Sequence, residues 1–180
     1  MRMTVFAIIF SALILASVCG CHPAPPQPAA KVQIAATPQR GDVPSPLPDN
    51  AFKAEITLLD VPSKLRVGQK ETIRVRIKNN SDVMWWARGA RINTRADNKF
   101  YIAAGNRWLK SDGSLLTEMD GRYGIPKDLA SGEETEVPLL ITAPKEPGDY
   151  ILEIDLVQEQ VAWFSEKGSP TAKTKITVVR

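Results

Sequence analysis

The sequence predicts an all-β fold, an antiparallel sandwich of about seven short strands, and three observations lead to this prediction. Apolar and polar residues alternate in several short segments, as they do in half-buried strands. Turn-forming residues recur about every 8–12 residues. No segment shows the apolar period of a long helix. Together these features favour an immunoglobulin-like sandwich over residues 51–180.

The alternating segments, taken in chain order, define the expected strands. They cover residues 54–58, 72–78, 83–86, 100–109, 134–142, 150–156 and 174–179. Pro138 predicts an edge position for the segment 134–142, because proline has no amide hydrogen to donate to a neighbouring strand. Two segments, 87–98 and 115–124, stay open between loop and short strand.

The segment 72–78 shows the clearest strand pattern, and the segment 150–156 is expected to be the central strand. Alternate residues from Tyr150 to Leu156 are apolar and predict the core face, whereas Glu153 and Asp155 predict a solvated face. A Pro-Gly corner precedes Tyr150, which is the place of a tyrosine that braces a corner of such a sandwich through its hydroxyl.

The first 20 residues are expected to be a signal peptide. Residues 5–18 form an uncharged apolar run, which is shorter than the roughly 20 residues that cross a bilayer. Residues 18–21 resemble a bacterial lipobox, which implies that Cys21 carries the lipid, with Cys19 as the alternative. The resemblance implies a lipid-anchored protein of the cell envelope, in the outer membrane of a two-membrane bacterium. An ordinary signal peptide with incidental cysteines is the other interpretation.

Residues 21–50 are expected to form a linker between the anchor and the sandwich. The segment is rich in Pro and Ala and shows no period. Such a composition cannot bury enough apolar surface to offset the entropy of ordering. We therefore expect a disordered spacer, with a Pro-rich ligand as the alternative.

Composition excludes several kinds of chemistry. The only histidine is His22 and the two cysteines precede residue 51, so the sandwich has neither Ser-His nor Cys-His catalysis. The same lack argues against a zinc or copper site, and we expect no metal and no cofactor. The net charge is only +3, and positive and negative side chains are interspersed along the chain, so we expect no nucleic-acid partner. The carboxylates of Glu153 and Asp155 leave a hydrolase as a remote possibility.

Most of residues 73–179 resembles a family of bacterial Ig-like modules related to the central, four-tryptophan domain of the NBR1 autophagy receptor. The stretches that carry the resemblance are 77–86, 105–113, 125–133 and 143–171. Modules of this family occur on bacterial surface-polysaccharide glycosyltransferases and methyltransferases, which implies an accessory or interaction domain. Two positions depart from the family: Trp86 stands where proline is expected, and Gln160 where glycine is expected.

The aromatic residues are the best candidates for binding. Successive strand residues point to opposite faces, so we expect Trp85 in the core and Trp86 on the surface. The candidate binding residues are Trp86, Arg107, Trp108, Gln158, Glu159, Trp163 and Phe164. The expected function is a non-catalytic, membrane-anchored binding module for a protein or a surface glycan. The alternative is a structural or assembly accessory of an envelope polysaccharide or secretion complex.

Overall fold

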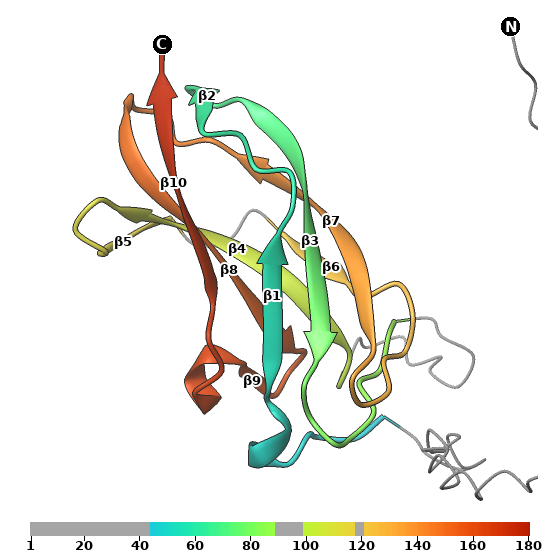
Figure 1. Cartoon of the computed structure of the whole chain (residues 1–180). Helices are drawn as coiled ribbons and strands as arrows, with labels where there is room; N and C mark the ends of the chain where they lie inside the picture. The colour runs from blue at the N-terminus through green and yellow to red at the C-terminus, as the bar shows by residue number, and fades with distance from the viewer. Residues whose placement is uncertain (1–43, 89–98, 118–120) are drawn as a thin grey trace, which may run out of the picture. The chain divides into compact units, whose positions relative to one another are not determined.

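The computed structural model describes residues 44–88, 99–117 and 121–180. The predicted signal peptide, both cysteines, most of the predicted linker and residues 89–98 lie outside the described residues. The described chain forms two β-sheets that pack face to face (Figure 1).

The smaller sheet contains three antiparallel strands. They are β1 (Ala54–Leu58), β3 (Lys70–Asn79) and β7 (Glu134–Thr142), in the order β1-β3-β7. Its inward face is aliphatic and buried, as the period-two pattern predicts; it includes Ile73, Val75, Ile77, Val137, Leu139 and Ile141. Strand β7 pairs with β3 and lies at the edge of this sheet, in agreement with the expectation from Pro138.

The larger sheet contains seven strands. Its main path runs β2 (Lys64–Arg66), β10 (Ala172–Val179), β8 (Gly148–Gln158), β4 (Ile102–Lys110) and β5 (Leu115–Thr117). Two short strands complete it: β6 (Arg122–Gly124) pairs with β4, and β9 (Ala162–Trp163) pairs with β8. Strand β8 lies between β10 and β4 and is central, as predicted.

One pairing differs from the predicted antiparallel pattern, because β2 runs parallel to β10. Between β1 and β2 the chain contains Pro62, which has no amide hydrogen to continue a strand ladder. The chain therefore leaves the smaller sheet after Leu58 and joins the larger sheet at Lys64 (Figure 1).

The core lies between the two sheets and includes an aromatic cluster at one end. The ring of Phe164 lies 5.0 Å from the rings of both Phe52 and Trp85, with edge-to-face geometry. Trp108 and Tyr150 form a second edge-to-face pair at 6.4 Å. The predicted fold class, an immunoglobulin-like β-sandwich, is confirmed.

The ordered fold begins before residue 51. Leu47 is buried, and a short 3₁₀ helix, η1 (Asp49–Ala51), leads into β1. The fully buried side chain of Gln158 accepts a hydrogen bond from the Leu47 amide (2.8 Å) and donates to the Ser45 carbonyl (2.9 Å). The last part of the segment predicted as linker is thus attached to the end of β8.

Two local features agree with the sequence. The Tyr150 hydroxyl donates a hydrogen bond to the Glu146 carbonyl at 3.0 Å, which is the predicted tyrosine corner. Gln160 has φ of 61°, a left-handed conformation that carries a steric cost for any residue with a Cβ. A glycine at this position would avoid that cost.

Candidate binding site

A buried ion-pair cluster lies on the outer face of the larger sheet. Arg107 on β4 stands opposite Glu153 on β8 in the strand register. Its Nε lies 3.1 Å from Glu153 Oε2, and a terminal guanidinium nitrogen lies 3.1 Å from Asp155 Oδ2. The expectation of a solvated face for these two carboxylates is wrong, because Asp155 is 1% exposed and Glu153 is 7% exposed.

The chain that follows β8 covers these carboxylates. The Ser165 hydroxyl, in the 3₁₀ helix η2 (Ser165–Lys167), donates to Asp155 Oδ2 at 2.6 Å. The Thr171 hydroxyl donates to Glu153 Oε1 at 2.8 Å. The period-two pattern gives the face of a residue correctly, but it does not report that another segment packs over that face.

Burial and hydrogen bonding act in opposite directions on the two carboxylates. Burial raises the pKa of Asp155 above its ordinary value, although the Ser165 hydroxyl, the Leu156 amide and Arg107 oppose this. Burial also acts to raise the pKa of Glu153. Hydrogen bonds from Thr171 and Lys173 and the charge of Arg107 outweigh it, so the pKa of Glu153 lies below 4.5. Both carboxylates are therefore engaged in holding the segment after β8 against the sheet.

Trp163 lies in contact with two arginines beside this cluster. The guanidinium of Arg107 is 5.5 Å from the centre of the indole, and that of Arg122, on β6, is 5.2 Å from it. Arg122 is also paired with Glu159, with 2.6 Å between nitrogen and oxygen. A half-exposed tryptophan is thus held between side chains from two other strands of the sheet.

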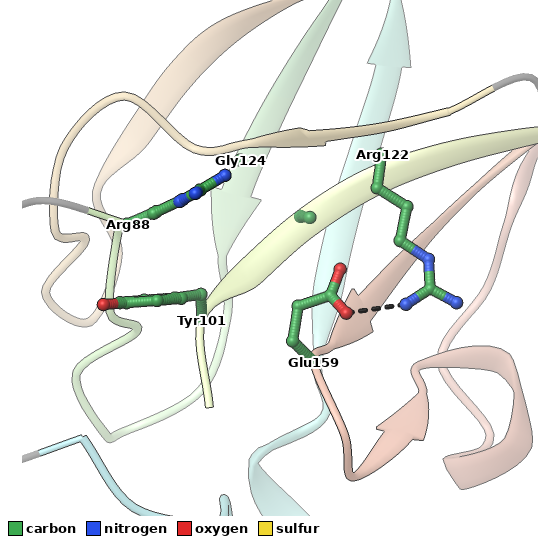
Figure 2. A pocket seen from close by; sticks show the side chains of 6 residues that line it. Arg88, Tyr101, Arg122, Gly124 and Glu159 are labelled. Atoms are coloured by element: carbon green, nitrogen blue, oxygen red, sulfur yellow. Dashed lines mark hydrogen bonds and ion pairs between the residues drawn. The ribbon is translucent and has the colours of Figure 1, made fainter. Parts of the chain in front are cut away.

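A polar pocket of about 260 Å³ adjoins this arrangement. Figure 2 shows Arg88 and Tyr101 on one side of it and Arg122 and Glu159 on the other. The remaining lining residues, Ala103 and Gly124, are register partners on β4 and β6 and have small side chains or none. We call this hollow the Arg88–Arg122 pocket.

The structure brings three of the candidate binding residues to this region and buries the other four. Arg107, Glu159 and Trp163 lie in or beside the pocket. Trp108, Gln158 and Phe164 point inward. Trp108 lies on the core face of β4, Gln158 holds the incoming chain, and Phe164 is the centre of the aromatic cluster. The alternation of apolar and polar residues does not predict which of these side chains are buried.

The predicted exposure of Trp86 is wrong, because its side chain is 5% exposed. Trp85 forms an isolated antiparallel bridge with Leu129, and the Trp86 carbonyl accepts a hydrogen bond from the Ile102 amide at 2.9 Å. The two tryptophans are therefore fixed between two neighbouring segments. Trp85 is in the core, as predicted.

The sequence interpretation missed Arg88, Tyr101 and Arg122. Arg122 belongs to the segment 115–124, which stayed open between loop and strand, and β6 is too short to show an alternating pattern. Arg88 comes just before residues 89–98, which the structure does not describe. The pairing of β6 with β4 brings these distant residues together, and no local sequence pattern predicts this pairing.

A second, more apolar groove of about 580 Å³ lies where the β4–β5 hairpin meets the β7–β8 corner. Its lining includes Trp108, Leu116, Pro144 and Tyr150, and we call it the Trp108 groove. Leu116, which lines it, is 38% exposed.

No group of three or more His, Cys, Asp or Glu side chains within residues 44–88, 99–117 and 121–180 is placed to hold a metal ion. In the same part of the chain, no helix has the length and apolar character needed to cross a membrane.

Comparison with known proteins gives similarity of fold only. No protein-family model and no curated protein matches the sequence. Solved structures that resemble the chain include the CARDB domain of a Pyrococcus furiosus protein in complex with di-metal ions, at TM-score 0.40 and 16% identity, over 71% of this chain and 91% of that domain. A β-glucosidase from Listeria innocua in complex with glucose aligns at TM-score 0.41 and 16% identity, over 71% of this chain and 16% of the enzyme.

The sporulation control protein of Bacillus subtilis aligns at TM-score 0.39 and 13% identity, over 71% of this chain and 49% of that protein. None of these similarities assigns an activity or a ligand. The structure itself shows an immunoglobulin-like β-sandwich with a polar pocket on the larger sheet.

Proposed function

We propose that this protein is a lipid-anchored binding protein of the cell envelope, and that its Ig-like domain binds a ligand at the Arg88–Arg122 pocket without catalysing a reaction. The observation that carries the proposal is the half-exposed Trp163, held between Arg107 and Arg122 beside a polar hollow. Aromatic and arginine side chains are the residues that dominate binding energy at recognition surfaces.

The arrangement is held in place before a ligand arrives. Glu159 fixes Arg122, while Glu153 and Asp155 fix Arg107. Side chains that are already ordered lose less conformational entropy on binding, which favours affinity. The carboxylates of Glu153 and Asp155 are engaged by cations and hydroxyls, which suits support of the site better than proton transfer.

The proposal of a lipid anchor and a linker rests on the sequence of residues 1–50. A chain fixed at Cys21, with a Pro- and Ala-rich spacer up to about residue 43, would leave the domain free to sample the space around the membrane. The partner would be a surface glycan or an envelope protein.

The test has one part for the anchor and one for the binding face. Replacing Cys21 with Ser should abolish incorporation of labelled palmitate and move the protein out of the membrane fraction. The full chain should bind at least one member of a panel of envelope polysaccharides, and Trp163→Ala should reduce that binding. Leu140→Ala, an exposed change on the opposite sheet, is the matched control. Binding that is equal in both variants would refute the proposed face.

A structural or assembly accessory remains the second candidate, and the Trp108 groove favours it. An apolar groove lined by the exposed Leu116 is typical of a protein contact rather than a glycan site. Stable co-purification with one envelope complex that is lost in Leu116→Asp but kept in Trp163→Ala would favour this candidate over the first.

A further inference from the structure

We propose that the Arg88–Arg122 pocket takes the acidic group of a saccharide, either the carboxylate of a uronic acid or the phosphate of a sugar phosphate. This inference rests on the proposed function and deepens it, because it states the chemical class of the ligand.

The charges of the lining favour an anion. The pocket is lined by two guanidinium groups, from Arg88 and Arg122, and by one carboxylate, from Glu159. The three charged side chains of the lining therefore carry a net charge of +1. Among the ion pairs formed between residues that the structure describes, none involves Arg88. Guanidinium groups match carboxylates and phosphates through paired, charge-assisted hydrogen bonds.

The positions of the two arginines suit an anion that enters between them. Figure 2 shows Arg88 and Arg122 reaching the pocket from opposite sides, with Arg122 already tied to Glu159. The Trp163 indole packs against Arg122 at 5.2 Å and limits its freedom further. The anion would contact Arg88 and share Arg122 with Glu159.

The other lining residues favour a saccharide over a protein partner. Binding sites for proteins are centred on large apolar or aromatic anchors that fill pockets. Apart from the buried Tyr101, the pocket offers no apolar side chain larger than that of Ala103. Its donors and its one carboxylate acceptor suit a ligand that carries both hydroxyl groups and an acid. An acidic peptide is the competing ligand, and the experiment includes it.

The experiment follows the indole N–H signals of the ¹⁵N-labelled full chain in a non-ionic detergent. The chain contains four tryptophans, and Trp163→Phe identifies the Trp163 signal by its loss. The probes are trigalacturonate, glucose 1-phosphate, neutral galactotriose, inorganic phosphate and a hexaglutamate peptide. We expect trigalacturonate or glucose 1-phosphate to move the Trp163 signal, and whichever of the two does so identifies the acid. Galactotriose, phosphate and the peptide should bind at least tenfold more weakly.

Three variants test the charges. Arg88→Gln should weaken binding of the acidic sugar by about tenfold, the size of a lost charge-assisted hydrogen bond. Glu159→Gln should strengthen it severalfold, because the change releases Arg122 from a competing carboxylate while keeping a hydrogen-bond acceptor. Arg76→Gln, on the outer side of β3 in the other sheet, removes the same charge and should leave binding unchanged. A purely structural role of Glu159 would give weaker binding instead.

The outcomes separate this inference from the proposed function. If galactotriose moves the Trp163 signal as strongly as trigalacturonate, and Arg88→Gln has no effect, the binding face stands and the preference for an acid is overturned. If inorganic phosphate or hexaglutamate binds as well as the acidic sugars, the site recognises an anion or an acidic peptide and the saccharide is overturned. If no probe moves the signal, the acidic saccharide is overturned, whereas the proposed binding face is decided by the polysaccharide panel and the Trp163→Ala variant.

Discussion

Arg107 provides a sharp test of how the larger sheet is stabilised. The change Arg107→Gln removes both ion pairs that join β4 to β8 across the outer face, at Glu153 and Asp155. It also removes one of the two cations that contact Trp163. The two carboxylates stay buried and lose the cation that they share, although Glu153 keeps the Lys173 ammonium at 3.0 Å.

The expected cost follows from the burial of the partners. Removing one member of a buried ion pair costs about 3–5 kcal/mol, because a charge is left without a partner. Arg107 is a third exposed, Glu153 keeps the Lys173 ammonium and the Thr171 hydroxyl, and Asp155 keeps hydroxyl and amide donors. Water and these partners therefore offset part of the loss. We expect a loss of about 2–3 kcal/mol, which lowers Tm by about 6–12 °C for a domain of this size.

The loss should depend on pH. The pKa of Glu153 is held below 4.5 in the fold, so its ion pairs stabilise the fold above pH 4.5 and this contribution is lost as the pH falls through the lower, folded value. The pKa of Asp155 is raised instead, so its ionised form opposes folding at neutral pH, and more so without Arg107. The difference in stability between wild type and variant should therefore be largest near pH 7 and should shrink as the pH falls below 4.5 and the two carboxylates become protonated.

The assay is thermal and urea unfolding of a non-lipidated form that begins at His22, monitored by circular dichroism between pH 3.5 and pH 8. Adding Asp155→Asn to Arg107→Gln should recover part of the stability, because it removes a buried charge that has lost its partner. A loss below about 0.5 kcal/mol, or a loss that stays constant with pH, would refute this account of the cluster.

Three further changes test single contacts by the same unfolding measurement. Gln158→Ala should cost about 2–4 kcal/mol, since the amide of buried Leu47 loses its partner, and early proteolysis near residue 45 should accompany it; an unchanged Tm would contradict the role of this side chain. Gln160→Gly should stabilise the domain by up to about 1 kcal/mol by relieving a left-handed φ, and any destabilisation would show that its side-chain contacts matter more. Tyr150→Phe should cost about 1 kcal/mol by removing the hydrogen bond to the Glu146 carbonyl, and a loss near zero would count against the tyrosine corner.

The strands were predictable because one face of each long strand is buried. In β3 and β7 the side chains alternate between core and surface, and this alternation is visible in the sequence. In β8 the apolar residues mark the core face in the same way, although the opposite face is covered as well. The same reasoning placed Tyr150 at its corner and Pro138 on an edge strand. These features depend on neighbours along the chain or on a single buried face.

The site was less predictable because it depends on contacts between distant segments. Arg122 reaches Glu159 and Trp163 only through the pairing of β6 with β4, and three residues of β6 carry no recognisable period. Glu153 and Asp155 have the sequence pattern of a solvated face, yet a later segment covers them. A local pattern describes the direction of a side chain but not what packs against it.

The attachment of the incoming chain to Gln158 has a mechanical consequence. Gln158 is followed directly by Glu159, which lines the pocket, so the point where the chain enters the fold and the point where a ligand would be held are adjacent in sequence. If a bound surface polymer pulled against the membrane anchor, tension would pass from Glu159 through Gln158 to Ser45 and Leu47. The β1–β3 ladder and the apolar core would lie outside this path until the Gln158 hydrogen bonds broke.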